Sequence, residues 1–195
     1  MRPKCDFRRR KAPVCPVKVH GHFLTFYTFQ RLNLLSNNFH CRCLLKSIRA
    51  ACEKDRIDLC AYVFMPDHVH MLILPQAAEH DIAAFERSVQ NDFSKQVLAE
   101  HHERALRRFR VREKSGVRGY RFWQAGRPFD EIVKSPKAAI AKMRFCEGDP
   151  VQQGLPSTSA SWRWTNFITD AQLSDKWAEL QSCQTASLNS EAPTN

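Results

Sequence analysis

Long apolar runs are missing from this sequence of 195 residues. No stretch approaches the roughly 18 consecutive apolar residues that a membrane-spanning helix needs. The basic residues at the N-terminus, Met1 to Lys4, are not followed by an apolar segment, so we expect no secretory signal. A basic amphipathic helix and a lipidation motif are missing too. These absences favour a cytoplasmic protein that has no membrane partner.

Paired metal-binding cysteines are also missing. The sequence has eight cysteines, but none of them forms a Cys-x-x-Cys pair. Cys41 and Cys43 are separated by one residue and could bind zinc together, but no second pair lies at a suitable spacing. Scattered cysteines in a chain of this length favour reduced thiols over a disulfide framework.

Positive charge is the strongest feature of the composition. Lys and Arg outnumber Asp and Glu by 30 to 20, and the formal net charge is +10. This excess favours a polyanionic partner, because basic side chains release counterions when they bind phosphates. Apolar residues make up 43% of the chain, which is enough for one core. We predict one domain over residues 17–168, with a flexible basic arm at 1–16 before it and a helix fragment with a disordered tail at 169–195 after it.

Local sequence patterns predict an alternation of strands and helices. Segments rich in aromatic and β-branched residues predict strands at residues 22–29, 57–64, 68–74 and 127–133. Apolar residues at helical spacing, together with caps at Asn37 or Asn38 and at Ser135, predict helices at residues 38–54, 79–99 and 135–148. A Met-Pro-Asp turn makes a hairpin of the second and third strands. Beyond residue 156 the pattern predicts irregular structure.

The densest basic segment spans residues 104–121, and aromatic residues lie among its arginines. Cationic side chains beside stackable rings suit single-stranded nucleic acid. A solvated charged segment would have the same pattern, so this feature alone leaves both interpretations open. The segment and the arm supply the predicted DNA-binding residues, which are Arg8, Arg9, Arg10, Arg107, Arg108, Arg110, Arg112 and Trp123.

Two histidines in the third predicted strand, His68 and His70, form a candidate metal pair. Residues i and i+2 of a strand point to the same face, so the two imidazoles lie side by side. Two neutral ring nitrogens can share a divalent metal. By spacing alone, the same pair is more often two ordinary surface residues, so the motif needs its context.

The context of the histidines resembles a known family. The run from Ala61 to Ile73 resembles the signature of the single-tyrosine transposases of the HUH class, and in particular of the REP-associated tyrosine transposases. The shared features are the Met-Pro turn, both histidines and the apolar flanks, while Asp67 stands where the family has Asn or Glu. Further resemblances follow the family order over about residues 20–167, in the segments 22–30, 122–124 with 129–130, 149–155 and 161–165.

The resemblance implies a fold and a metal site. The implied fold is of the α/β (α+β) class, with a ferredoxin-like antiparallel sheet that carries the two histidines and has helices packed on it. The implied metal ligands are His68, His70 and Asp149, and the implied cofactor is Mg²⁺ or Mn²⁺. The catalytic tyrosine of the family lies five residues before the proline of its Asn-Pro-Val segment, which is the position of Phe145 here. Positions 145 and 149 are four residues apart, so on a helix they share a face.

Phe145 separates this chain from the family chemistry. In the family, a tyrosine oxygen attacks a phosphate of single-stranded DNA, which gives a 5′-phosphotyrosine and a free 3′-hydroxyl. A phenylalanine has no hydroxyl, so position 145 cannot carry out this attack. The sequence has three tyrosines. Tyr120, in the basic segment, is a weak substitute for the missing nucleophile, whereas Tyr27 and Tyr62 are expected to pack on the sheet.

Three functions are consistent with these residues. The first is an active transposase that cleaves and transfers single-stranded or hairpin DNA. The second is a domesticated relative that binds DNA hairpins in a metal-dependent way and does not cut them, and Phe145 favours it. The third is an RNA-binding module, because ferredoxin-like folds also serve RNA binding. We expect a monomer or a homodimer.

Overall fold

The computed structural model describes residues 19–77, 80–101, 105–112, 118–126, 128–155 and 162–190, and it describes the side chains as far as residue 181. The basic arm predicted at residues 1–16, with Arg8, Arg9 and Arg10, lies outside the described residues. No helix in the described ranges is long and apolar enough to cross a membrane.

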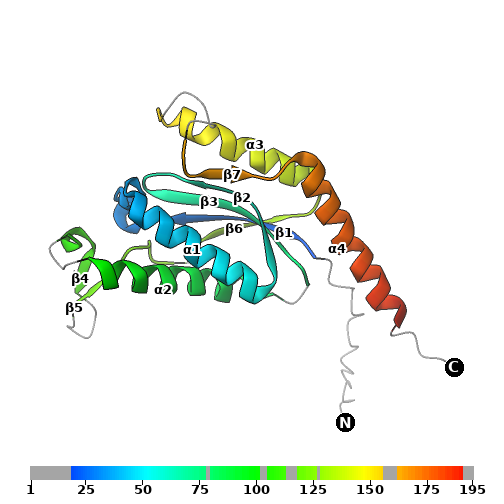
Figure 1. Cartoon of the computed structure of the whole chain (residues 1–195), viewed down its shortest axis with the longest axis horizontal. Helices are drawn as coiled ribbons and strands as arrows, with labels where there is room; N and C mark the ends of the chain where they lie inside the picture. The colour runs from blue at the N-terminus through cyan, green and yellow to red at the C-terminus, as the bar shows by residue number, and fades with distance from the viewer. Residues whose placement is uncertain are drawn as a thin grey trace, which may run out of the picture.

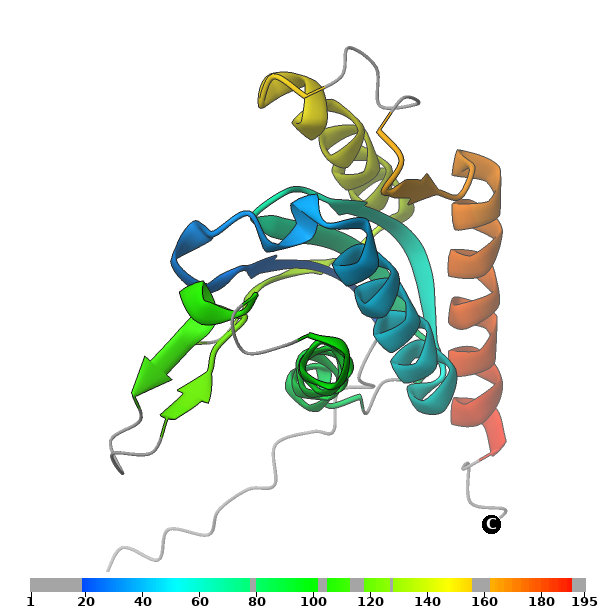
Figure 2. The same ribbon diagram turned by 60° about the vertical axis from the view of Figure 1, so that its left-hand side comes forward.

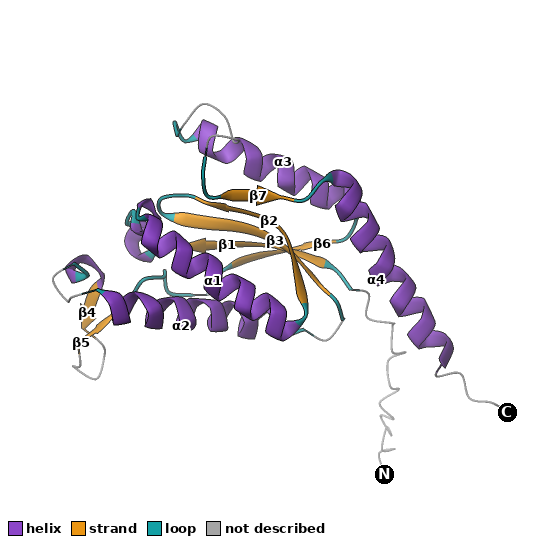
Figure 3. Ribbon diagram, viewed as in Figure 1, coloured by secondary structure: helices purple, strands orange, loops and turns teal. Residues whose placement is uncertain are grey.

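A five-stranded antiparallel sheet forms the centre of the molecule (Figures 1 and 3). Its strands, in spatial order, are β6 (Phe129–Val133), β1 (Gly21–Tyr27), β3 (His68–Pro75), β2 (Ile57–Phe64) and β7 (Thr165–Phe167). The first four strands and the two helices that connect them have the order of a ferredoxin-like β-α-β-β-α-β unit. The fold class predicted from the sequence is therefore confirmed.

Helices cover both faces of the sheet (Figure 2). The helices α1 (Asn38–Asp55) and α2 (Ile82–Glu100) lie on one face, and α3 (Pro136–Gln152) and α4 (Asp170–Ser190) lie on the other. Three short 3₁₀ turns and a two-stranded hairpin complete the structure: η1 (Phe29–Arg31), η2 (Leu34–Ser36), η3 (Arg107–Phe109), β4 (Arg110–Arg112) and β5 (Arg118–Tyr120).

Strand β3 divides the core into two clusters. Every residue of this central strand is buried. Because side chains alternate along a strand, Val69 and Met71 pack toward α1 and α2, whereas Leu72 and Leu74 pack toward α3 and α4. His68 and His70 lie four and two residues before Leu72, so their side chains point to the same face of the sheet as that of Leu72, toward α3. The alternation therefore decides which helix meets the histidines.

Side-chain caps fix the starts of the predicted helices. Asn37 accepts a hydrogen bond from the N–H of Phe39 at the start of α1, and Ser135 accepts one from the N–H of Ala138 at the start of α3. The predicted second helix began at residue 79, but α2 begins three residues later because the side chain of Asp81 caps it.

The C-terminal region is more regular than predicted. The irregular structure expected beyond residue 156 was wrong for β7, and the helix fragment expected within residues 169–195 is the 21-residue α4. Leu173, Trp177 and Leu180 follow one another at helical spacing and are buried against the sheet, and the ring of Trp177 lies over Gly21. This stripe packs the first half of α4 against the sheet, and the helix continues to Ser190.

The cysteines of the described residues are free thiols, as predicted. Five of them are buried. Burial raises the pKa of Cys41, Cys52, Cys60 and Cys146 to about 12, so these side chains are protonated thiols that fill space in the core.

Candidate metal centre

The structure brings the two histidines and Asp149 together in one buried cluster. The Nε2 atoms of His68 and His70 lie 3.1 Å and 3.7 Å from Oδ2 of Asp149. One ligand atom from each residue can be chosen so that all three lie within 4.8 Å of one another. All three side chains are less than a tenth exposed. Residues 81 positions apart in the sequence thus converge on one point.

Helix α3 supplies Asp149 because it continues further than the sequence suggested. It was predicted to end near residue 148, but it extends through Pro150 to Gln152. Asp149 and Phe145 therefore lie on one helical face, and the ring of Phe145 contacts the imidazole of His70 edge-on, with ring centroids 5.5 Å apart. Gln153 donates a hydrogen bond to the second oxygen of Asp149 and fixes the carboxylate.

The outer nitrogen of each imidazole has its own partner. Nδ1 of His68 lies 2.7 Å from a carboxylate oxygen of Asp67, which only accepts, so Nδ1–H donates to it, and on the other side of the ring Nε2 lies 3.1 Å from Oδ2 of Asp149. Nδ1 of His70 lies 2.7 Å from the hydroxyl of Thr25, which can accept in the same way. Partners of this kind orient metal-binding imidazoles and fix their tautomers. Both Nε2 atoms thus point toward Asp149, where a bound metal would take the place of a proton on Nε2.

Burial and neighbouring charges favour the metal-binding protonation states. Burial, together with the positive charges of His68 and Arg31, lowers the pKa of His70 to about 4, although Asp149 acts in the opposite direction. Burial by itself would raise the pKa of Asp149, but hydrogen bonds from His68 and Gln153 outweigh it and the pKa lies below its usual value. At neutral pH the cluster is thus a neutral His70 imidazole beside an ionised carboxylate.

These donors fit a divalent metal ion. Two imidazole nitrogens and one carboxylate oxygen form a three-residue set that leaves other coordination positions for water or a phosphate oxygen. A buried carboxylate next to two imidazole nitrogens gains electrostatically from a cation between them. His68, His70 and Asp149 would hold the metal, which would polarise a bound phosphate and stabilise charge on it.

Comparison with known proteins identifies the family. A family model described as transposase, IS200-like, matches residues 17–135. The chain belongs to the IS200-like transposase family. The matched region contains His68 and His70 but ends before Phe145 and Asp149, so the third ligand is placed by the structure.

One of the two solved structures compared with this IS200-like chain shares its fold. A REP-associated tyrosine transposase bound to a REP hairpin has a TM-score of 0.60 and 16% sequence identity, with 84% of this chain and 83% of that chain covered. A candidate transposase from Deinococcus radiodurans has a TM-score of 0.44 and 16% identity, with 75% of this chain and 98% of that chain covered. No curated protein sequence matches the chain.

The structure of this family member does not bring Tyr120 to the histidines. Tyr120 lies on β5 and packs against the cluster on the α1–α2 side of the sheet, whereas the histidines face α3. Trp123 is buried, with its ring between Phe26 and Phe93, so in this conformation it packs in the core and is not free to stack on a base. Its contact with DNA stays a prediction.

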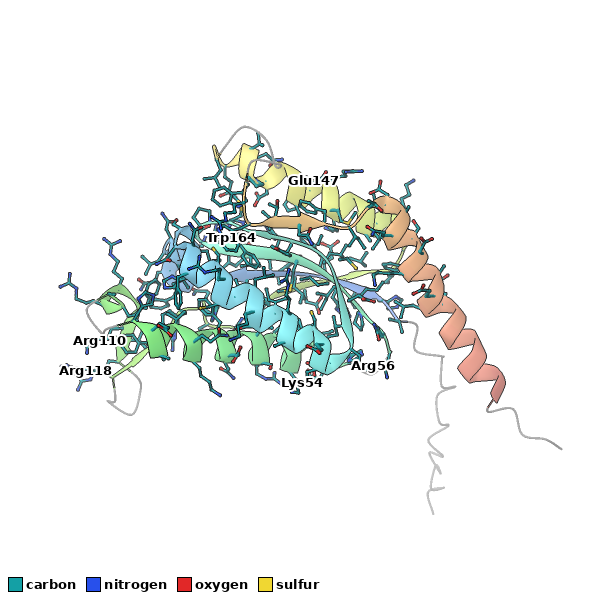
Figure 4. All side chains as sticks on the ribbon, in the orientation of Figure 1. Lys54, Arg56, Arg110, Arg118, Glu147 and Trp164 are labelled. Carbon is teal, nitrogen blue, oxygen red and sulfur yellow. The ribbon has the colours of Figure 1, made fainter. Side chains whose placement is uncertain are left out.

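The predicted basic residues lie on the surface at the same end of the sheet as the metal centre. Arg107, Arg108, Arg110 and Arg112 are exposed on η3 and β4. Figure 4 shows Arg110 and Arg118 on the β4–β5 hairpin, far from Lys54 and Arg56 at the opposite end. The segment after the hairpin is joined to the end of β1, where Gln124 donates a backbone hydrogen bond to Tyr27. The chain segment that follows the hairpin is therefore joined to the end of β1, the strand whose Thr25 and Tyr27 contact the two histidines.

Three residues at the centre were not singled out from the sequence. Asp67 and Thr25 hold the outer nitrogens of the histidines, and Arg31 forms an ion pair with Asp67. Tyr27, expected to pack on the sheet, is 39% exposed and tilts against His68, with ring centroids 5.8 Å apart. Only the pairing of β1 with β3, which places Tyr27 opposite His68 and Thr25 opposite His70, reveals these contacts.

Proposed function

We propose that this chain binds single-stranded or hairpin DNA at a divalent-metal centre and does not cut it at position 145. The observation that carries the proposal is the complete buried donor set of His68, His70 and Asp149 beside Phe145. The set supplies what is needed to hold a metal and, through it, a phosphate. The neighbouring ring lacks the oxygen that would attack that phosphate.

Hairpin DNA is the ligand to test first. A structural relative, the REP-associated tyrosine transposase, was solved bound to a REP hairpin. The exposed arginines of η3 and β4 lie at the same end of the sheet as the centre and can contact phosphates of a duplex stem while a single-stranded flank reaches the metal. The positive net charge supports the same partner.

Each residue of the centre has a separate role in this proposal. His68 and His70 present Nε2 to Mg²⁺ or Mn²⁺, with their tautomers fixed by Asp67 and Thr25. Asp149 supplies the anionic oxygen that compensates part of the metal charge. Phe145 covers one side of His70 and keeps water from it. Its ring carries no hydroxyl that could attack a phosphate.

The test is a binding and cleavage assay with one labelled DNA hairpin that carries single-stranded flanks. We expect the affinity, followed by fluorescence anisotropy, to fall when Mn²⁺ or Mg²⁺ is replaced by EDTA, and to fall equally in His68→Ala with metal present. A denaturing gel of the same mixtures should show no covalent protein–DNA band. Equal binding with metal and with EDTA, or a covalent band in the natural protein, would overturn the proposal.

An RNA hairpin of the same sequence separates DNA from RNA binding. The A-form geometry and 2′-hydroxyls of RNA change both the groove and the phosphate spacing. We expect DNA to bind more tightly. Preference for the RNA hairpin would favour the RNA-binding function instead.

A further inference from the structure

The backbone that carries Arg31 is strained. Gln30 and Arg31 both have positive φ, 52° and 57°, in the left-handed region that residues with side chains rarely adopt. Two such residues in succession persist only where the surroundings hold them. Here the single hydroxyl hydrogen of Thr28 is shared between the carbonyl oxygens of Leu32 and Asp67, at 2.7 Å and 2.9 Å from Oγ1, and the side-chain oxygen of Gln124 accepts from the N–H of Gln30.

This backbone fixes the guanidinium of Arg31 beside the metal centre. Its Nε lies 2.7 Å from one oxygen of Asp67, and the other oxygen of that carboxylate accepts from His68. The guanidinium also lies over the ring of Tyr27, 4.4 Å from the ring centroid. Arg31 is thus held by two contacts, with Asp67 and with Tyr27, and both of these residues contact His68.

Part of the guanidinium remains available. The Arg31 side chain is 50% exposed, and the contact with Asp67 uses one of the five N–H donors of an arginine. Among the described residues, the structure gives Arg31 no second ion pair. The planar guanidinium suits a phosphate. It is already ordered and half exposed to solvent, so the side chain loses little conformational entropy when a phosphate binds.

The charge balance of the centre favours a phosphodiester at this point. Asp149 and Asp67 are offset in part by Arg31, and Lys142 on the other side is paired with Glu131. A divalent metal then leaves one positive charge in excess, which one phosphodiester group neutralises. The positive charges of Arg31 and the metal repel each other. A phosphate anion that lies between them offsets this repulsion, because it is attracted to both.

We propose that Arg31 is a phosphate-binding residue of this centre, and that its guanidinium and the metal contact the same DNA phosphodiester. The inference rests on the proposed function, because it needs DNA at the metal. Asp67 and Tyr27 act as positioning residues for Arg31. The chemical group recognised is a single phosphodiester monoanion, independent of base sequence.

The experiment compares Arg31→Gln and Arg31→Lys with the natural protein. The hairpin affinity is measured in Mn²⁺ and in EDTA, and the Mn²⁺ affinity of the DNA-free protein is measured by calorimetry. We expect Arg31→Gln to lose roughly 10- to 100-fold in hairpin affinity in Mn²⁺, because it removes a charge-assisted hydrogen bond, and to lose much less in EDTA. Arg31→Lys should lie between the two, since it keeps the charge without the fork. The Mn²⁺ affinity of the DNA-free variants should stay the same or increase.

Two control variants separate the role of Arg31 from general effects. Arg87→Gln removes an exposed arginine that pairs with Asp81 at the start of α2, and it should leave the metal-dependent affinity unchanged. Arg49→Gln removes an exposed arginine of α1, outside the centre, and should also bind as the natural protein does.

The outcomes distinguish this inference from the proposed function. If the natural protein binds the hairpin only with metal, and Arg31→Gln loses no more affinity than Arg87→Gln, only the inference is overturned. A parallel loss of Mn²⁺ affinity in the DNA-free Arg31→Gln variant would also overturn it, because Arg31 would then act only through Asp67 and His68. If the natural protein binds equally with Mn²⁺ and EDTA, the proposed function fails and the shared phosphate fails with it.

Discussion

The ring of Phe145 lies edge-on to the imidazole of His70, with ring centroids 5.5 Å apart. The helix that carries Phe145 also carries Asp149, which lies within 4 Å of both imidazoles. The geometry that would place a nucleophile beside the metal is therefore present, although the nucleophilic oxygen is not. The metal centre and the missing hydroxyl can be tested separately.

Phe145→Tyr should restore cleavage. The new hydroxyl would extend from a half-exposed ring that already contacts His70, so no backbone movement is needed to bring it to the centre. With Mg²⁺ or Mn²⁺ and a labelled hairpin, we expect a covalent protein–DNA band on a denaturing gel that the natural protein lacks. Phe145→Tyr combined with His68→Ala should give no band.

A covalent band from the natural protein would contradict this expectation and would identify another nucleophile. Tyr27→Phe and Tyr120→Phe then locate it. Tyr27 is the tyrosine whose ring contacts His68, while Tyr120 packs on the other face of the sheet. Loss of the band in Tyr27→Phe would assign the attack to β1.

Asp67→Ala should weaken metal binding by roughly 10- to 100-fold, the usual effect of removing the partner of a metal-binding histidine. The carboxylate holds the proton of His68 on Nδ1 and leaves Nε2 free. Calorimetric titration of the DNA-free protein with Mn²⁺ measures the effect. Asp130→Ala is the matched control, since it removes a carboxylate from His22, a histidine outside the centre. Equal Mn²⁺ affinity in the natural protein and Asp67→Ala would refute the role of Asp67.

Without metal, the protein should lose stability as the pH falls below about 6.5. The pKa of His70 is about 4 in the folded protein and has its ordinary value of 6.5 in the unfolded chain, so between these values the unfolded state binds the extra proton. At pH 5 this amounts to about 2 kcal/mol of lost unfolding free energy, and the loss levels off below pH 4. Burial lowers the pKa of His40 as well and acts in the same direction. Asp149, whose pKa is depressed, loses its stabilising ionisation only at still lower pH.

Urea denaturation in EDTA at pH 7.5 and pH 5 measures this pH dependence. His70→Gln should show a smaller difference between the two pH values than the natural protein. An unchanged difference would mean that burial of His70 does not control the acid sensitivity.

Arg107→Gln combined with Arg108→Gln should weaken hairpin binding for every sequence. Both side chains are exposed on η3, next to the β4–β5 hairpin, and each phosphate contact removed should lower the salt dependence of the affinity by about one unit of slope. Lys54→Gln combined with Lys95→Gln removes the same charge from helices α1 and α2 and is the control. A salt slope equal to that of the natural protein would exclude these arginines from the interface.

Trp177→Ala should destabilise the whole domain by about 3–5 kcal/mol, as expected for the loss of a buried aromatic side chain. The ring fills the space over Gly21 and packs with Val133 at the edge of the sheet. Asp175→Ala, at an exposed position of the same helix, should change the unfolding free energy by less than about 0.5 kcal/mol. A single unfolding transition that shifts in Trp177→Ala shows that α4 belongs to the domain. A transition that does not shift would show that α4 docks without contributing to stability.

The sequence by itself determined the elements whose information is local. The alternation around His68 and His70, the caps at Asn37 and Ser135 and the turn before His68 define the strands and helices, and the structure confirms them within a few residues. Two further conclusions needed no structure. The i, i+4 spacing of positions 145 and 149 is a property of the helix itself, and the lack of a hydroxyl at position 145 is read directly from the sequence.

Tertiary structure alone decided the surroundings of the metal centre. Whether Trp123 faces solvent or the core depends on Phe26 and Phe93, which lie far from it in the sequence. The contacts of Asp67 with Arg31, and of Tyr27 with His68, arise from the antiparallel pairing of β1 and β3 and from a left-handed backbone at Arg31. Strand register and loop conformation depend on long-range packing, which no window of sequence contains. The candidate ligands His68, His70 and Asp149 could therefore be named from the sequence, whereas the residues that contact them became visible only in the fold.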